Sequence, residues 1–191
     1  RTWVQARYPA QEPLPQWSGA RQGGRIRIGY FSADFHNHAA AYLAAEMFEL
    51  HDRSRFEIIA FSFGPDRNDD MRKRIVSAMD RFIDVRGKSD REVAEMSRAL
   101  GIDIAVDLKG HTEDSRLGLF AYRAAPVQVT YLGYPGTTSA DYMDYLIADP
   151  VVIPEHNRRW FSEKIVYLPD CYQVNDSTRK IAQAVPTRRS L

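Results

Sequence analysis

Three short segments of the chain gather side chains suited to binding or transforming a polar substrate, and the first runs from Ser32 to His38. It carries a carboxylate at Asp34, imidazoles at His36 and His38, and an amide at Asn37. A predicted helix follows directly, and the backbone donors and dipole at a helix start favour an anion. A histidine here can act as a general base, because its ordinary pKa of about 6.5 lies near working pH. The alternative is that Asp34 or Asn37 merely caps the helix.

The second segment extends from Asp107 to His111, after another apolar run. Gly110 lets the backbone approach a ligand closely, Lys109 is suited to a phosphate, and His111 is suited to a hydrogen bond with a substrate. The alternative is an ordinary glycine turn beside exposed polar residues.

The third segment reads Tyr-Leu-Gly-Tyr-Pro-Gly-Thr-Thr over positions 131–138. Its glycines and proline indicate a tight, stiff loop with exposed backbone donors. Its two tyrosines offer flat apolar faces with hydroxyl groups, which suit a sugar or a nucleotide. Taken alone the string is a weak signal, because Pro-Gly also marks simple turns.

Several functional classes are disfavoured. The chain lacks the glycine-rich fingerprints of dinucleotide and P-loop sites and the serine elbow of α/β-hydrolases. The histidine cluster has no third ligand at a recognised spacing, so we expect no metal ion and no cofactor. The net charge of +1 gives no case for nucleic acid or an acidic membrane surface. No apolar stretch approaches the roughly 18 residues that a membrane span needs.

The elements that must position these segments alternate between strands and helices. We predict strands over 26–31, 56–63, 81–85, 102–108, 126–131, 145–148 and 164–168, and helices over 39–50, 70–79, 89–100 and 112–122. A capping box of Ser89 and Glu92 begins the third helix, Gly101 ends it, and Thr112 is expected to cap the fourth. This alternation predicts an α/β fold with a doubly wound, mostly parallel sheet, in which ligands bind outside the carboxyl ends of the strands.

The rest of the chain sets the domain organisation that we expect. Residues 1–24 are rich in proline, glutamine and glycine and indicate an irregular lead-in from a preceding region, although Trp3, Tyr8 and Trp17 within it are expected to pack on something. We assign residues 25–175 to a half-domain and residues 176–191 to the connection that follows. A start without methionine leads us to expect a piece of a longer protein. A single cysteine favours a reducing, cytoplasmic setting.

The three segments, in this order and spacing, resemble the protein O-GlcNAc transferase family, which includes bacterial members and the SPINDLY-type transferases. The matching strings are RIRIGYFSADFHNH (25–38), FEIIAFSFGPD (56–66), IDIAVDLKGHT (102–112), RAAPVQVTYLGYPGTTSADYMDYLIADP (123–150) and FSEKIVYLPDCY (161–172). The resemblance covers most of the chain, and its Leu-Gly-Tyr-Pro-Gly block is specific.

This resemblance implies one Rossmann-like half of a GT-B glycosyltransferase, often preceded by tetratricopeptide repeats. The family transfers N-acetylglucosamine from UDP-N-acetylglucosamine to serine or threonine of proteins, with inversion and without a metal. Its active-site histidine falls on His38, and a carboxylate proposed to relay the proton falls on Asp34. We therefore expect His38 and Asp34 to be catalytic, and the substrate- or donor-binding residues to be Asn37, His111, Leu132, Gly133, Tyr134, Pro135, Gly136 and Thr137. The chain departs from the family at Ala39 and Ala40, where Pro-Thr is common.

The expected partners are a nucleotide-sugar donor, a protein or peptide acceptor, and a C-terminal half that supplies most contacts to the nucleotide. Without that half we expect the isolated chain to be inactive. Two alternatives stay open: a SPINDLY-like transferase with another donor such as GDP-fucose, and a non-catalytic flavodoxin-like scaffold that binds partners through its aromatic lead-in.

Overall fold

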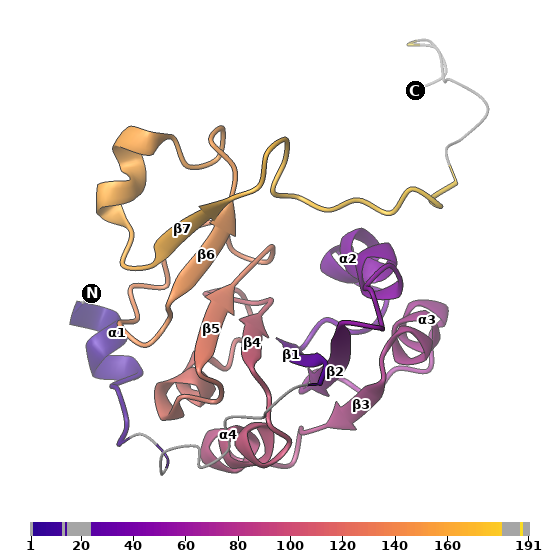
Figure 1. Ribbon diagram of the computed structural model, residues 1–191, viewed down its shortest axis with the longest axis horizontal. Coiled ribbons are helices and arrows are strands. Elements are labelled where there is room, and N and C mark those ends of the chain that lie inside the picture. The colour runs from indigo at the N-terminus through magenta and orange to yellow at the C-terminus, as the bar shows by residue number, and fades with distance from the viewer. Residues whose placement is uncertain (1, 13, 15–23, 181–187, 189–191) are drawn as a thin grey trace.

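The computed structural model describes residues 2–12, 14, 24–180 and 188 of the 191-residue chain. Seven parallel strands form one sheet, with helices on both faces (Figure 1). The strands are β1 (Ile26–Ser32), β2 (Phe56–Ser62), β3 (Arg81–Asp84), β4 (Ile104–Asp107), β5 (Val127–Thr130), β6 (Tyr145–Ala148) and β7 (Lys164–Tyr167). The helices are α1 (Thr2–Arg7), α2 (Ala39–Glu49), α3 (Asp70–Ala78) and α4 (Asp90–Ala99), with two short 3-10 helices, η1 (Leu117–Tyr122) and η2 (Glu155–Trp160).

The predicted doubly wound sheet is confirmed. Its strand order is β3-β2-β1-β4-β5-β6-β7, so the chain winds outward from β1 to β3 and then returns to the other side of β1 at β4. The winding direction therefore reverses between β1 and β4. In folds of this kind the crevice for a ligand opens at that reversal, outside the carboxyl ends of the two strands.

Burial on both faces of the sheet follows from the alternation of side chains along the strands. From β1, Ile28 and Tyr30 pack in the apolar cluster that includes α2 and α3. Phe31 points the other way, into a cluster with α4 and η1, where its ring stacks on Phe61 at a centroid distance of 4.4 Å. Because both faces of β1 are covered, its carboxyl end is a rigid platform for the loop that follows.

The helix boundaries largely follow the expected capping chemistry. The capping box of Ser89 and Glu92 begins α4, and Gly101 ends it with a left-handed φ of 66°. Asp69 caps α3 by accepting a hydrogen bond from the backbone N–H of Arg72 at 2.9 Å.

The helix expected from Thr112 to Tyr122 is wrong over its first half. The Thr112 hydroxyl donates to the carbonyl of Lys109 at 2.9 Å instead of capping a helix. Asp114 has a left-handed φ of 59°, which interrupts helical geometry, and the Arg116 guanidinium donates to two carbonyls of the β3–α4 connection. With these hydrogen bonds, residues 112–116 form turns, and the only helical part of the predicted segment is the 3-10 helix η1.

The lead-in is more regular than the sequence suggested, because α1 forms within it. Val4 and Leu14 are buried in the cluster that also holds α4 and η1, and Tyr8 packs against that cluster. The segment thus packs on this domain. Trp3 is 63% exposed, whereas Trp17 lies outside the described residues.

After β7 the chain crosses from the β7 side of the sheet to α2 and α3, as the yellow segment of Figure 1 shows. The Asp176 carboxylate accepts a hydrogen bond from Arg74 of α3 at 2.5 Å, and the Ser177 backbone N–H donates to Glu46 of α2 at 2.6 Å. These contacts fasten the segment to both helices. The rest of the expected connection, residues 181–187 and 189–191, lies outside the described residues.

Over the residues that the structure describes, no helix is both long enough and apolar enough to cross a bilayer.

Candidate functional site

The three chemically rich segments meet at one edge of the sheet. In the register of the parallel strands, Phe31 of β1 lies beside Asp107 of β4, and Asp107 lies beside Thr130 of β5. The loops that follow these strands therefore leave from adjacent positions, at the reversal of winding direction. This is the placement that the sequence predicted.

A buried ion pair joins the first two loops across that reversal. The Lys109 Nζ lies 2.9 and 2.7 Å from the two carboxylate oxygens of Asp34, and the residues are 4% and 8% exposed. Sequence reasoning suggested Lys109 for a phosphate, but its ammonium group is committed to Asp34. The pair brings together two positions that are 75 residues apart in the chain.

His38 occupies the N-cap position of α2. Its Nδ1 accepts a hydrogen bond from the backbone N–H of Ala40 at 3.2 Å and lies 3.6 Å from the nearer carboxylate oxygen of Asp34. The suggestion that Asp34 or Asn37 caps this helix is therefore wrong, because α2 starts at Ala39 as predicted and His38 directly precedes it. A backbone N–H can only donate, so a neutral His38 carries its proton on Nε2 and offers that N–H outward. Its side chain is 43% exposed.

Asn37 and His36 line the outer part of the same loop. The Asn37 backbone N–H donates to the Asp69 carboxylate at 3.1 Å, which ties the loop to the start of α3. Asn37 is exposed, and the His36 ring meets the His38 ring edge-on at 5.8 Å. The Asn37 side chain is thus accessible to a ligand.

The loop after β4 is shaped by Asp107, which is buried. Its two carboxylate oxygens accept the backbone N–H groups of Lys109 at 2.9 Å and Gly110 at 3.0 Å. Burial raises the pKa of Asp107 to about 6, although those two backbone donors oppose the rise. Gly110 has a φ of 57°, and a Cβ there would lie 2.7 Å from the Cβ of Tyr134, so this position requires glycine.

His111 links this loop to the third one. Its Nε2 lies 2.9 Å from the carbonyl oxygen of Thr138. The ring sits between two aromatic rings in edge contacts, with centroids 6.0 Å from Trp3 and 5.5 Å from Tyr134. His111 is partly exposed.

The loop after β5 contains the expected residues Leu132 to Thr137, and it presses against the loop after β4. A Cβ on Gly133 would meet the backbone oxygen of Leu108 at 2.0 Å, so only glycine permits this approach. Leu132 adopts a left-handed φ of 69°, a strained conformation for a branched residue. Tyr134 and Pro135 are exposed at the tip, whereas Gly136 and Thr137 are partly buried. The expected binding residues therefore lie together at this edge.

Sequence reasoning assigned no role to Glu163, which anchors the far end of the third loop. Its carboxylate accepts hydrogen bonds from the Thr137 hydroxyl at 2.7 Å, the Thr138 backbone N–H at 2.6 Å, the Thr138 hydroxyl, and the Ser162 hydroxyl at 3.1 Å. Glu163 is 4% exposed. The available signal was an acidic residue directly before the apolar run of β7, inside the string that carries the resemblance.

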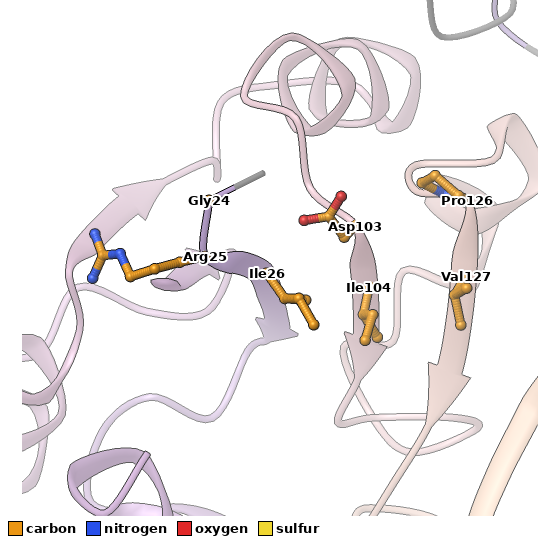
Figure 2. Close-up of a pocket in the computed structure, with 7 residues that line it drawn as sticks. All are labelled: Gly24, Arg25, Ile26, Asp103, Ile104, Pro126 and Val127. Atoms are coloured by element: carbon orange, nitrogen blue, oxygen red, sulfur yellow. The ribbon is translucent and has the colours of Figure 1, made fainter. Parts of the chain in front are cut away.

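A hollow of about 400 Å³ lies at the opposite edge of the sheet, shown in Figure 2. It is lined by the amino ends of β1, β4 and β5, at Gly24, Arg25, Ile26, Asp103, Ile104, Pro126 and Val127. The Arg25 side chain points away from it, and the Asp103 carboxylate accepts a hydrogen bond from the Arg27 backbone N–H at 2.8 Å. We place the site at the carboxyl edge, because the three loops that carry the predicted site residues meet there. Within the described part of the chain, no group of three or more potential ligands could hold a metal ion.

Comparison with known proteins gives a consistent result. A family model described as glycosyl transferase family 41 matches residues 11–187. A probable UDP-N-acetylglucosamine–peptide N-acetylglucosaminyltransferase of Arabidopsis thaliana, SEC, is 41% identical over 173 residues, which are 91% of this chain and 17% of the relative. The corresponding transferase of Caenorhabditis elegans is 34% identical over 166 residues, 84% of this chain and 14% of the relative.

The SPINDLY protein of Arabidopsis thaliana, also named as a probable transferase of that kind, is 32% identical over 90% of this chain and 19% of the relative. Among solved structures, an O-GlcNAc transferase of Thermobaculum terrenum superposes with a TM-score of 0.82 at 36% identity, over 90% of this chain and 33% of that one. The chain thus spans at most about a third of the length of these proteins.

Proposed function

Because the chain belongs to glycosyl transferase family 41, we propose that the protein transfers N-acetylglucosamine from UDP-N-acetylglucosamine to serine or threonine hydroxyls of proteins. This chain is then the N-terminal Rossmann-like half of a GT-B catalytic region, and a C-terminal half supplies most of the nucleotide contacts. The observation that carries the proposal is the meeting of three loops at the winding reversal of the sheet. By itself the chain is expected to be inactive.

In the proposed reaction, the acceptor hydroxyl attacks the anomeric carbon in line with the departing UDP, which inverts the configuration. His38 contacts the reacting groups from the start of α2, where it orients the hydroxyl or accepts its proton. Asp34 fixes the loop through Lys109 and lies 3.6 Å from the His38 Nδ1. Accepting a proton at Nε2 first requires His38 to move its own proton to Nδ1, facing Asp34, and to release the backbone of Ala40.

The donor sugar is proposed to lie along the loop from Leu132 to Thr137, with Asn37 and His111 beside it. Backbone N–H groups in such a tight loop suit sugar hydroxyls, and the exposed face of Tyr134 suits a sugar ring. Stabilisation of the leaving diphosphate belongs to the C-terminal half, and such stabilisation is commonly the largest contribution to catalysis.

Transfer of labelled N-acetylglucosamine from its UDP donor to a peptide by the full-length protein tests the proposal. His38→Ala should lower kcat by about 10²–10⁴-fold, the range of a positioned acid or base. His156→Ala is the matched control, since His156 is exposed on η2 and belongs to none of the three loops. Near-normal turnover of His38→Ala would remove His38 from the mechanism, and no transfer by the wild-type protein would refute the proposed function.

A SPINDLY-like transferase with another donor is the second candidate, because the chain is also 32% identical to a SPINDLY protein. Hydrolysis of UDP-N-acetylglucosamine and of GDP-fucose, measured side by side on the full-length protein, separates the two. Faster hydrolysis of GDP-fucose would replace the donor in our proposal while leaving the reaction class unchanged.

Outside the transfer site, we propose a cytoplasmic protein in which tetratricopeptide repeats precede residues 1–24. The one cysteine of the chain, Cys171, is an exposed free thiol, in keeping with a reducing compartment. Binding to nucleic acid or to a membrane is not part of the proposal. Fractionation of cells that express the full-length protein is the corresponding test.

A further inference from the structure

We propose that His111 accepts a hydrogen bond at Nδ1 from a hydroxyl group of the bound substrate, and that Glu163 acts through Thr138 as the positioning residue for this contact. This inference rests on the proposed function, which supplies two candidates for the hydroxyl: one on the sugar of the nucleotide donor and one on the serine of the acceptor.

The protonation of the His111 ring follows from its partner. The Nε2 atom lies 2.9 Å from the Thr138 carbonyl oxygen, and a carbonyl oxygen has no proton to give. The proton of a neutral His111 therefore resides on Nε2, which leaves the lone pair on Nδ1. In this state the ring can only accept at Nδ1.

The Nδ1 lone pair is available, and the ring is held in a fixed orientation. Among the residues that the structure describes, no hydrogen-bond donor is paired with it. The rings of Trp3 and Tyr134 meet the imidazole edge-on, each at an interplanar angle of 74°, and so define its plane. His111 remains partly exposed on the loop beside the proposed donor site.

His38 has the complementary arrangement. Its Nδ1 is used by the Ala40 N–H, so the neutral ring offers a donor at Nε2. The loops that carry the two histidines are tied together by the pair of Asp34 and Lys109. A hydroxyl group both donates and accepts, so an edge that presents one imidazole donor and one imidazole acceptor suits a ligand rich in hydroxyls.

Glu163 enforces the position of the Thr138 carbonyl without touching the substrate. One of its oxygens accepts both the backbone N–H and the hydroxyl of Thr138, and the other accepts the Thr137 hydroxyl. No lysine, arginine or histidine of the described part of the chain forms an ion pair with this buried carboxylate. Hydroxyl and amide donors therefore hold its negative charge, and their geometry fixes residues 137 and 138.

Two substitutions of His111 separate the Nδ1 contact from a structural role in the full-length protein. His111→Gln can place an amide N–H near the former Nε2 and keep the bond to Thr138, but it has no acceptor at Nδ1. His111→Asn places its polar atoms near Nδ1 and gives up Thr138. If His111 had a purely structural role, His111→Gln would retain more ligand affinity than His111→Asn. Our inference predicts the opposite order.

Calorimetric titration with UDP-N-acetylglucosamine and with a serine peptide measures the affinities directly. We expect His111→Gln to weaken one ligand roughly tenfold, the loss of about one hydrogen bond, and His111→Asn to weaken it less. Loss confined to the nucleotide sugar assigns the hydroxyl to the donor. Loss confined to the serine peptide, and absent for its alanine counterpart, assigns it to the acceptor. Wild-type affinity of His111→Gln for both ligands overturns the proposal.

Long-range ¹H–¹⁵N spectra of ¹⁵N-histidine protein report the tautomer of His111 without any need for activity. The expected result is a proton on Nε2, and a proton on Nδ1 overturns the proposal even if transfer is normal. Glu163→Gln should shift the tautomer population and weaken the same ligand, whereas Glu155→Gln, an exposed control on η2, should do neither. If transfer fails while the tautomer is as expected, the proposed function is refuted separately.

Discussion

Removing Lys109 while keeping Asp34 should be far more damaging than removing both charges. In Lys109→Met the methionine roughly fills the space of the lysine stem, but the Asp34 carboxylate loses the ammonium group that contacts both of its oxygens. Both residues are buried. Deleting one partner of a buried ion pair typically costs about 3–5 kcal/mol, because a buried charge remains without compensation.

We expect the low end of that range, about 3 kcal/mol of unfolding free energy, because His38 lies 3.6 Å from Asp34 and can compensate in part. That compensation is limited, since the His38 ring is 43% exposed and already accepts the Ala40 N–H. The double variant Asp34→Asn/Lys109→Met removes both charges and should recover about 2 kcal/mol relative to Lys109→Met, a coupling typical of residues in direct contact.

Urea unfolding followed by circular dichroism measures these free energies, and an unchanged m-value will show that all variants unfold alike. Lys73→Met is the matched control, because Lys73 forms an exposed pair with Asp70 at 3.7 Å and should change stability by less than about 1 kcal/mol. A loss below 1 kcal/mol for Lys109→Met, or a double variant no more stable than the single one, would refute the reasoning.

A crowded glycine, a buried aspartate and an ion pair near the C-terminal end of the described chain can each be tested by substitution. Gly133→Ala should lower the free energy of unfolding, measured with heat or urea, by about 2–4 kcal/mol, because the new Cβ would collide with the backbone of Leu108. Gly87→Ala is the control: the space around Gly87 is open, so this variant should change the free energy of unfolding by less than about 0.5 kcal/mol. Burial raises the pKa of Asp107 to about 6, so unfolding free energy should fall by roughly 2–3 kcal/mol as pH rises from about 4 through 6, and Asp107→Asn should flatten that slope. The Arg74 guanidinium lowers the pKa of Asp176, so this pair stabilises above about pH 4 and weakens as pH falls further; Asp176→Asn should accelerate amide exchange over residues 171–178 at neutral pH. An unchanged exchange rate, an unchanged pH slope, or equal stabilities of the two glycine variants would contradict these respective arguments.

The sequence predicted the fold well because local signals and the global fold agree. Alternating apolar runs gave the seven strands, and the capping box at Ser89 gave the start of α4. The failure came between Thr112 and Arg116, where the guanidinium of Arg116 binds carbonyls of the β3–α4 connection. No local pattern announces a contact with carbonyls about 30 residues earlier in the chain, so helical spacing alone was misleading.

For the candidate site as well, local sequence patterns predicted some features and could not predict others. Glycine, proline and polar residues after apolar runs marked the three loops, and strand register then placed them side by side. Two pairings could not be predicted, because both depend on the order of the strands in the sheet. Asp34 and Lys109 are 75 positions apart in the chain, and Glu163 and Thr138 are 25 positions apart. Likewise, helical spacing did not specify that His38, and not Asp34 or Asn37, would be the N-cap residue.

The position of β1 between β2 and β4 has a consequence for the order in which the chain acquires structure. Within this chain β1 is synthesised before the other strands, and it pairs with β2 after a connection that contains only the helix α2, so the contacts between β1 and β2 are comparatively local. Its other neighbour, β4, arrives only after β2, α3, β3 and α4 have been made. Closing so long a loop is slow. During synthesis, the edge of β1 that will pair with β4 therefore stays open to mispairing until Asp107 has emerged, and chaperone protection at that stage would act on this edge.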